Sequence, residues 1–343
     1  MQGSERIGVL LVNTGTPSAP TPRAVRSYLA RFLMHPRIAP MNRLAWWFIL
    51  HLAILPKRGK ASAQKYARIW TPEGSPFSLA HEALVRGVQE LFDAEGRDVL
   101  VRCAMSFGEP RVAAALKELK AAGCTRLVVL PLYPQSAFST TGVARDEAAR
   151  ALRSLRWKVP CETVPDYHAH PTYVKAVAAS IRHAGFEAKS DDRLLFSYHS
   201  IPLSDIDQGD VYELQTGATS LRIAETLGLG RERWTIAYQC RFDKGRDWLA
   251  PTTAEALERW AQAGAERVFL VCPNFAVDCL ETLYDIGCEL GPAYLQRRRM
   301  EGHPTDAGSF VYVPCLGKSR AHARVLHDVL TDCLDGAAGA ARR

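Results

Sequence analysis

The sequence has no Cys-x-x-Cys pair, although it contains nine cysteines in 343 residues. Cysteines at that spacing typically bind structural zinc or iron–sulfur clusters, so such a site has little support. Because the number of cysteines is odd and their positions are scattered, a disulfide framework is not expected either. We therefore expect reduced thiols and a cytoplasmic protein.

Long apolar runs and basic clusters are also missing. No apolar stretch reaches the ~20 residues that a transmembrane helix needs, and we expect no targeting segment before the first strand. No Lys/Arg run is interleaved with aromatic residues, so nucleic acid is not expected as a partner. The excess of 43 basic over 36 acidic residues, a net charge of +7, instead favours an anionic ligand or an anionic membrane surface.

The chain does contain apolar strands that alternate with helical segments. This alternation is typical of parallel βαβ units and predicts an α/β fold. The pattern starts again near residue 166, so we predict two similar halves, 1–165 and 166–318, followed by a C-terminal segment, 319–343, that packs back on the first half. This segment is predicted to hold a helix at 319–334 and a frayed tail. The predicted strands are 7–13, 99–105, 126–132, 193–198, 234–239, 266–272 and 309–313.

A histidine lies at the end of one of these strands. The apolar run before His199 indicates a strand buried on both faces, and Pro202 ends it because proline cannot donate to the ladder. Ligands of open α/β sheets bind outside the carboxyl ends of the strands. His199 is therefore either a histidine that is hydrogen-bonded into a loop or a functional group at this edge.

An acidic row follows the strand predicted at 266–272. In a helix at 278–290, Glu281, Asp285 and Glu289 are spaced i, i+4 and i+8 and share one face. Like charges at this spacing destabilise a helix, and no Lys or Arg follows until Arg297. The row is either a solvated acidic surface or a line of oxygen ligands and proton acceptors.

The most apolar stretch of the chain is 44–55, which contains Trp46 and Trp47 and is flanked by Arg43, Lys57 and Arg58. It is too short to span a bilayer. It is either a buried core helix or an interfacial segment whose basic flanks contact lipid headgroups. The adjacent tryptophans favour the interface.

Several motifs together give the chain a strong resemblance to the ferrochelatases, which insert ferrous iron into a porphyrin in haem synthesis. The resemblance runs from the motif LVNTGTP at 11–17 to YVP at 312–314. Its most specific parts are SYHSIP at 197–202, GDVY at 209–212, WLAP at 248–251 and CPNFAVDCLETLY at 272–284.

The resemblance implies two Rossmann-like domains with the porphyrin cleft between them, and a set of site residues. His199 and Glu281 match the catalytic pair, and Asp285 and Glu289 continue the metal-binding acidic line. The stretch 41–56 matches the lip that shapes the porphyrin cleft and contacts the membrane. The porphyrin-binding positions fall on Arg58, Tyr66, Ser75, Trp46, Trp47 and Trp248.

The chain also departs from some members of that family. It lacks the C-terminal cysteine cluster of members that carry a [2Fe–2S] centre, and Phe138 stands at the remaining cluster position, so no cluster is expected. Cys272, Cys279, Cys288 and Cys315 leave an unusual cysteine site as a minor alternative. Thr14 stands where coproporphyrin-using members have a tyrosine, which favours protoporphyrin IX. Cys240 replaces a serine, and Ala254 replaces an acidic residue.

The resulting hypothesis is insertion of Fe²⁺, a substrate, into protoporphyrin IX with release of two protons. Coproporphyrin III ferrochelatase, or another tetrapyrrole chelatase such as a cobalt enzyme, is the alternative. A non-catalytic tetrapyrrole or metal carrier is a third reading. The residues leave open whether His199 or Glu281 takes the protons and which of them first binds iron.

Overall fold

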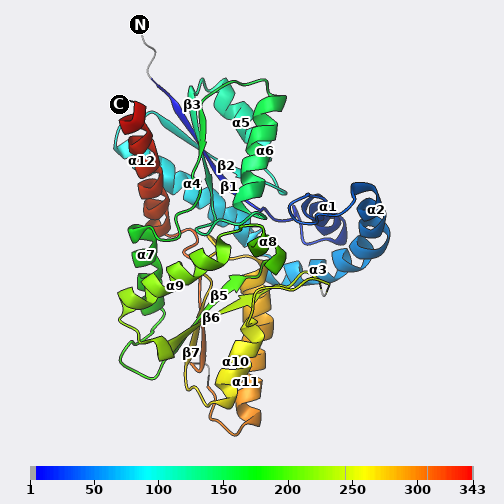
Figure 1. Ribbon diagram of the computed structural model, residues 1–343, viewed down its shortest axis with the longest axis vertical. Helices are drawn as coiled ribbons and strands as arrows, with labels where there is room; N and C mark the ends of the chain where they lie inside the picture. Colours follow the sequence, from blue (N-terminus) through cyan, green and yellow to red (C-terminus); the bar gives the residue numbers. More distant parts are fainter. Residues whose placement is uncertain (1–4, 244, 307, 342–343) are drawn as a thin grey trace. The chain divides into compact units, whose positions relative to one another are not determined.

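The computed structural model describes residues 5–243, 245–306 and 308–341, and the chain divides into two compact units (Figure 1). Unit 1 consists of Met1–Tyr133, Ala137–Asp166 and Lys318–Arg343, and unit 2 of Pro134–Ser136 and Tyr167–Gly317. Arg342 and Arg343, the last residues of the predicted tail, lie outside the described residues.

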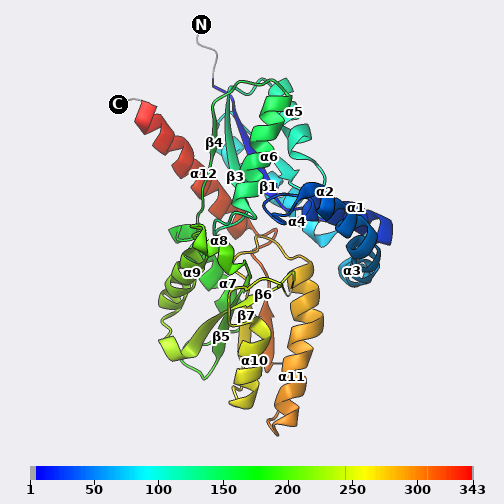
Figure 2. The ribbon, with the colours of Figure 1, turned by 45° about the vertical axis from the view of Figure 1, so that its right-hand side comes forward.

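Unit 1 is a four-stranded parallel sheet in the order β2-β1-β3-β4. Helices α5 and α6 cover one face, and α4 and α12 cover the other (Figures 1 and 2). Its elements are β1 (Ile7–Asn13), α1 (Pro22–Leu33), α2 (Arg43–Phe48), the π-helix η1 (Ile49–Ile54), α3 (Leu55–Ile69), α4 (Pro76–Ala94), β2 (Val99–Met105), α5 (Val112–Ala121), β3 (Arg126–Pro131), α6 (Thr141–Ser154), β4 (Cys161–Thr163) and α12 (Arg320–Ala341).

Unit 2 repeats this topology, with the parallel order β6-β5-β7-β8. Helices α7 and α9 lie on one face of the sheet, and α10 and α11 lie side by side on the other (Figure 2). The elements are α7 (Pro171–His183), β5 (Arg193–His199), α8 (Leu203–Asp207), α9 (Tyr212–Leu227), the 3₁₀ turn η2 (Arg231–Arg233), β6 (Trp234–Gln239), α10 (Thr253–Gln262), β7 (Val268–Val271), the π-helix η3 (Leu280–Leu290), α11 (Gly291–Met300) and β8 (Phe310–Val313). The predicted α/β fold with two similar parallel-sheet halves is confirmed.

The central strands form because their side chains are apolar on both faces. All seven residues of β1 are buried, and so are the four residues of β7. Helices on both sides of each sheet supply the apolar partners, which is why these strands are continuous apolar runs rather than alternating ones. The sheet cores therefore fix where each strand ends.

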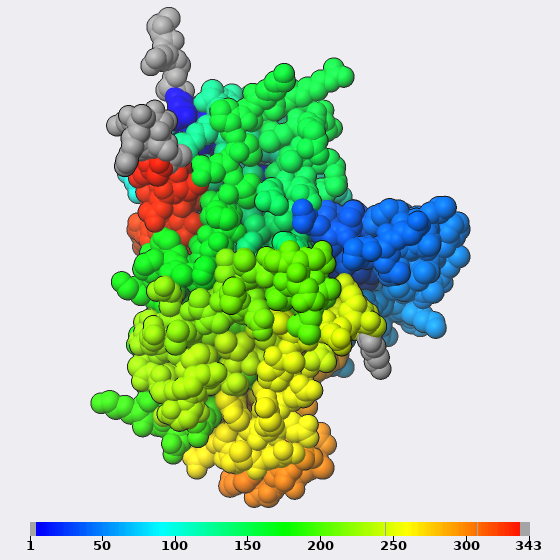
Figure 3. Space-filling model, viewed as in Figure 1, coloured from blue at the N-terminus to red at the C-terminus, as the bar shows by residue number. Residues whose placement is uncertain are grey.

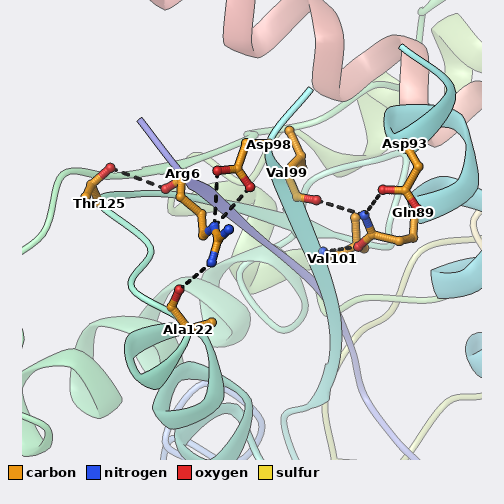
Figure 4. Close-up of polar contacts among 8 residues, drawn as sticks. All are labelled: Arg6, Gln89, Asp93, Asp98, Val99, Val101, Ala122 and Thr125. Carbon is orange, nitrogen blue, oxygen red and sulfur yellow. Dashed lines mark hydrogen bonds and ion pairs between the residues drawn. The ribbon is translucent and has the colours of Figure 1, made fainter. Parts of the chain in front are cut away.

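The edge strand β2 is closed by a side chain (Figure 4). The Gln89 amide oxygen accepts from the Val101 N–H, and its nitrogen donates to the Val99 carbonyl, each at 2.8 Å. The same nitrogen donates to Asp93 at 2.8 Å. An open edge would expose unpaired backbone groups. Gln89 on α4 thus makes the hydrogen bonds that a neighbouring strand would otherwise make at this edge.

Some elements differ from the sequence predictions. Strand β4 is a three-residue edge strand, too short to leave a hydrophobic pattern, and α8 and α11 were not predicted. The segment predicted as helix 278–290 is the π-helix η3, whose hydrogen bonds run i→i+5. The predicted frayed tail is wrong up to Ala341, because α12 continues through it as a helix.

The stretch 44–55 is not a buried core helix. Leu44 and Leu52 are 71% and 72% exposed, whereas Leu50 and Leu55 are buried against the core of unit 1. The stretch spans α2 and η1 and leads into α3, which appear in blue at the surface in Figure 3. The core-helix alternative is therefore wrong. Among the described residues, no helix has the length and apolar character needed to cross a bilayer.

The buried histidine His81 makes the stability of unit 1 depend on pH. His81 is buried, with Nδ1 donating to the Phe77 carbonyl (2.7 Å) and Nε2 accepting from the Asn13 amide (3.0 Å). Burial lowers the pKa of His81 from 6.5 to about 4, assisted by repulsion from His322 and opposed by the Phe77 carbonyl. The unfolded chain therefore binds this proton at a higher pH than the folded chain does.

We predict that stability is lost as the pH falls from 6.5 to 4, by about 3 kcal/mol from this group. Above pH 6.5 the contribution is fully present, because both states are then neutral. Calorimetric melting at pH 7 and pH 5 checks this, with His81→Gln expected to flatten the pH dependence. The exposed His183→Gln is the control, and equal behaviour of the two variants contradicts the prediction.

Candidate functional site

His199 is the last residue of β5, at the carboxyl edge of the sheet in unit 2. Its Nδ1 lies 2.7 Å from the Ser200 carbonyl oxygen. Because a carbonyl only accepts, Nδ1 carries the proton and Nε2 holds the lone pair in the neutral ring. The side chain is half-buried, so the backbone fixes the tautomer in a partly desolvated place.

The surroundings of His199 favour this neutral form. Burial lowers the pKa of the imidazole, and this effect outweighs the carboxylates of Glu281 and Asp285 and the Ser200 carbonyl, which all raise it. A neutral imidazole near physiological pH is able to accept a proton. Glu281 and Asp285 are near enough to His199 for their charges to raise the pKa of its imidazole.

The acidic row lies on the π-helix η3, which follows β7. Strands β5 and β7 are neighbours, although β6 lies between them in the sequence. The chain therefore changes direction across the sheet at β5, and this switch point is where ligands of open α/β sheets bind. Along η3, Glu281 and Asp285 are half-buried and Glu289 is exposed. The row thus leads from the vicinity of His199 to solvent.

A hydrogen-bond network holds the first turn of η3. One oxygen of Asp278 accepts from the Tyr312 hydroxyl at 2.5 Å and from the Thr282 hydroxyl at 3.1 Å. The Thr282 oxygen in turn accepts from the Cys279 N–H at 2.9 Å. Because Glu281 lies between these residues in the sequence, the network fixes the backbone that carries it.

Aromatic rings lie beside His199. The Phe242 ring is centred 5.1 Å from the imidazole and 5.9 Å from the Trp248 ring. Trp248 is buried, its indole N–H donates to the Asp243 carbonyl at 3.1 Å, and Arg246 lies over its face. Sequence reasoning selected Trp248 and missed Phe242, although Phe242 lies in the same loop after β6.

Four thiols of unit 2 lie where the protonated form is favoured. Burial raises the pKa of Cys240, Cys272, Cys279 and Cys315 well above the usual range, and nearby carboxylates raise it further. Metal–sulfur clusters need thiolates. Within the described residues, no group of three or more His, Cys, Asp or Glu side chains is arranged to hold a metal ion.

The remaining predicted residues lie in unit 1. Trp46 is half-buried, and its indole N–H donates to the Leu33 carbonyl at 2.7 Å, whereas Trp47 is exposed and stacks on His51. Arg58 is exposed on α3, and Tyr66 is buried on the same helix. Ser75 is the N-cap residue of α4 and is buried. Thr14, the residue after β1, shares a 2.5 Å hydrogen bond with the Tyr133 hydroxyl.

Comparison with known proteins gives this site its context. The ferrochelatase family profile matches residues 6–334. The chain belongs to the ferrochelatase family. It is also 40% identical over 331 residues to the ferrochelatase of Nitrosococcus oceani, which covers 96% of this chain and 88% of that protein. The chain is accordingly a metal chelatase, a lyase that inserts ferrous iron into a porphyrin in haem synthesis.

Solved structures agree with this assignment at the level of the fold. SirB from Bacillus subtilis, solved with Fe³⁺, has a TM-score of 0.55 at 11% identity and covers 97% of this chain and 98% of its own. The sirohydrochlorin chelatase SirB from Bacillus subtilis subspecies spizizenii, in complex with cobalt, has a TM-score of 0.51 at 12% identity, with 97% of each chain covered. The two-domain α/β fold is thus shared with chelatases.

The hydrogen-bond network that holds the first turn of η3 can be tested by measuring the stability of variants. We predict that Thr282→Val lowers the free energy of unfolding by about 1–3 kcal/mol, because it leaves the Cys279 N–H and the Asp278 carboxylate without this hydroxyl. Urea unfolding measures the loss. Thr226→Val is the control, since that exposed hydroxyl donates to the Arg222 carbonyl of its own helix, and it should change stability by less than about 0.5 kcal/mol. Equal losses in the two variants would show that the network contributes nothing special.

Proposed function

We propose that the porphyrin is protoporphyrin IX and that His199 accepts the pyrrole protons. The observation that carries this proposal is a neutral imidazole with a fixed tautomer beside two carboxylates at a sheet switch point. Metal insertion requires two N–H protons to leave the porphyrin while the iron sheds its water. A partly desolvated base and an adjacent row of oxygen ligands suit these two tasks.

Glu281, Asp285 and Glu289 receive the iron and carry protons away in this proposal. Carboxylates are hard ligands that suit a hydrated dication, and the increase in exposure along η3 gives the row an end in solvent. Glu281 is nearest in sequence to the anchored first turn and is the second strongest influence on the pKa of His199, after burial. We therefore assign it to the reacting centre, and Asp285 and Glu289 to delivery.

The porphyrin contacts follow from the chemistry of the side chains. Arg58 is suited to bind a propionate, because guanidinium–carboxylate pairs form strong charge-assisted hydrogen bonds. Trp46, Trp47 and Tyr66 offer aromatic surface, Ser75 offers a hydroxyl, and Trp248 supports Phe242 beside His199. Thr14 supports protoporphyrin IX over coproporphyrin III, because a tyrosine characteristic of coproporphyrin-using members is absent there. We infer that no [2Fe–2S] cluster is bound.

We predict that His199→Ala and Glu281→Gln each reduce iron insertion by about 10²-fold or more. Asp285→Asn and Glu289→Gln should cause milder losses, mainly at low Fe²⁺, because solvent offers a parallel route. The control is Glu258→Gln, an exposed carboxylate on α10. An anaerobic absorbance assay with Fe²⁺ and protoporphyrin IX or coproporphyrin III measures all of these. Full activity in His199→Ala refutes its role, and faster turnover of coproporphyrin III refutes the substrate.

We also propose a cytoplasmic protein whose lip, the stretch 41–56, touches the membrane surface. Exposed Leu44, Trp47 and Leu52 supply the apolar contact, and Arg43 and Lys57 supply positive charge beside it. Trp46 is a poor probe of this contact, because it is anchored to Leu33 and a charge there would damage the core.

The double variant Leu44→Glu with Leu52→Glu should lower binding to anionic vesicles by about tenfold or more, since two apolar side chains no longer insert. Its melting temperature should hardly change, because both residues are exposed. Leu214→Glu on α9 is the matched control, with a leucine that is 76% exposed, and should bind vesicles normally. Unaltered vesicle binding by the double variant would remove the support for the membrane contact.

A further inference from the structure

The exposed large apolar side chains of the described residues are concentrated in two places. There are eleven of them, of which six belong to the lip and four lie at α8 and α9 in unit 2. The four in unit 2 are Leu203, Val211, Leu214 and Leu221, and the eleventh is Met300 on α11. Soluble monomers rarely gather exposed apolar side chains unless that surface binds something. Unit 2 therefore carries a second candidate contact surface, besides the lip of unit 1.

Three of these residues, Val211, Leu214 and Leu221, form a stripe along α9, which we call the α9 stripe. Val211 is the N-cap residue of the helix, and Leu214 and Leu221 are seven residues apart, so all three lie on one side of it. Leu214 is 76% exposed and Leu221 is 48% exposed. Between them, no atom lies within 4 Å of the position that a Cβ of Gly217 would take. A second chain can therefore approach the middle of the stripe closely.

The lip and the α9 stripe lie in segments of opposite charge. The segment 7–72, which contains the lip, has seven arginines and three lysines but no aspartate or glutamate. The segment 194–221, which contains the stripe, has three aspartates and one glutamate but no lysine or arginine. Of these carboxylates, Asp207 and Glu213 are exposed close to the stripe in the sequence. The two apolar surfaces are therefore complementary in charge as well as similar in chemistry.

We propose that the lip of one copy of this chain docks on the α9 stripe of a second copy. Opposite charges favour this pairing over a contact between two lips or two stripes, which would bring like charges together. Because the two surfaces differ, the contact is heterologous and leaves a free lip and a free stripe at the ends of each assembly. The proposal shares the lip with the proposed membrane contact, but it does not depend on that contact or on the proposed chemistry.

The size of the two surfaces indicates a weak and reversible association. They offer six and three exposed large apolar side chains, whereas a stable interface has about 20–30 residues on each side. We therefore expect a dissociation constant of the order of 10 μM, because the cost of association consumes most of the gain from burial. Such an association covers the apolar lip when no membrane is within reach, and an anionic membrane surface competes for the same residues.

Sedimentation velocity of the purified full chain at about 1–100 μM, without lipid or detergent, tests the proposal. We expect the average mass to rise above that of one chain as the concentration increases. The stripe variant, Leu214→Lys with Leu221→Lys, and the lip variant, Leu44→Glu with Leu52→Glu, should each stay monomeric. An equal mixture of the two should form a dimer, because each variant keeps the surface that the other lacks. Met300→Lys, at an exposed apolar residue outside both surfaces, is the control and should associate like the unaltered chain. Melting temperatures verify that each variant folds.

Several results would overturn the proposal. An unaltered chain that stays monomeric over this range excludes the contact, and so does a mixture of the two variants that stays monomeric. Association that persists in the stripe variant indicates a contact between lips, and association that persists in the lip variant indicates a contact between stripes. Loss of binding to anionic vesicles in the stripe variant would assign the stripe to the membrane instead. Because sedimentation is measured without lipid, porphyrin or iron, its failure leaves the proposed membrane contact and the proposed chemistry to their own assays.

Discussion

The parallel pairing of β5 with β7 is the constraint on which the candidate site depends. It places the end of β5, with His199, next to the end of β7, from which the chain passes to η3. The pairing is itself set by burial, because the register partners Leu195 and Leu270 are fully buried in the same apolar cluster on one face of the sheet. A slip of one residue would turn His199 to the opposite face of the sheet.

The π-helix η3, which follows β7, carries the row of acidic side chains. Its i→i+5 hydrogen bonds make a wider turn than that of an α-helix. Such helices are rare in proteins, and those that occur often lie at functional sites. Like charges at close spacing add a cost to this geometry. The hydroxyls of Tyr312 and Thr282 offset it by binding Asp278 at the start of the helix. The stability of the first turn therefore comes from tertiary hydrogen bonds rather than from helix propensity.

The sequence predicted strands better than it predicted helix type. The bounds of β1 and β2 were predicted to the residue; β1 is buried throughout and leaves a continuous apolar run, and β2 is a mainly apolar edge strand. The type of the helix at 278–290 was not predictable, because propensity does not distinguish i→i+4 from i→i+5 bonding. The apolar composition of 44–55 left a core helix and an interfacial segment as alternatives, because an apolar side chain carries no sign of whether something covers it. The adjacent tryptophans favoured the interface, in agreement with the exposure of Leu44 and Leu52.

In the candidate site, some residues were predicted from the sequence and others were not. His199, Glu281 and Asp285 were identified from residue type and from motifs of the resembled family, and their electrostatic proximity agrees with that grouping. Phe242 was missed because an aromatic residue in a loop has no periodic signal, and its contact with the imidazole exists only in three dimensions. The contact between the Cys240 thiol and the Asp285 carboxylate was also unpredictable, because the left-handed backbone of Cys240 sets the direction of the thiol.

The balance of forces on His199 links metal binding to proton transfer. Burial lowers the pKa of the imidazole, and the charges of Glu281 and Asp285 partly restore it. A dication bound by those carboxylates cancels their negative charge, so it removes this support and favours the neutral ring. In the proposed mechanism, a proton taken from the porphyrin by His199 is therefore expelled more readily when the next metal ion reaches the acidic row. Proton release and metal loading would thus be coupled through the same two carboxylates, without a conformational change.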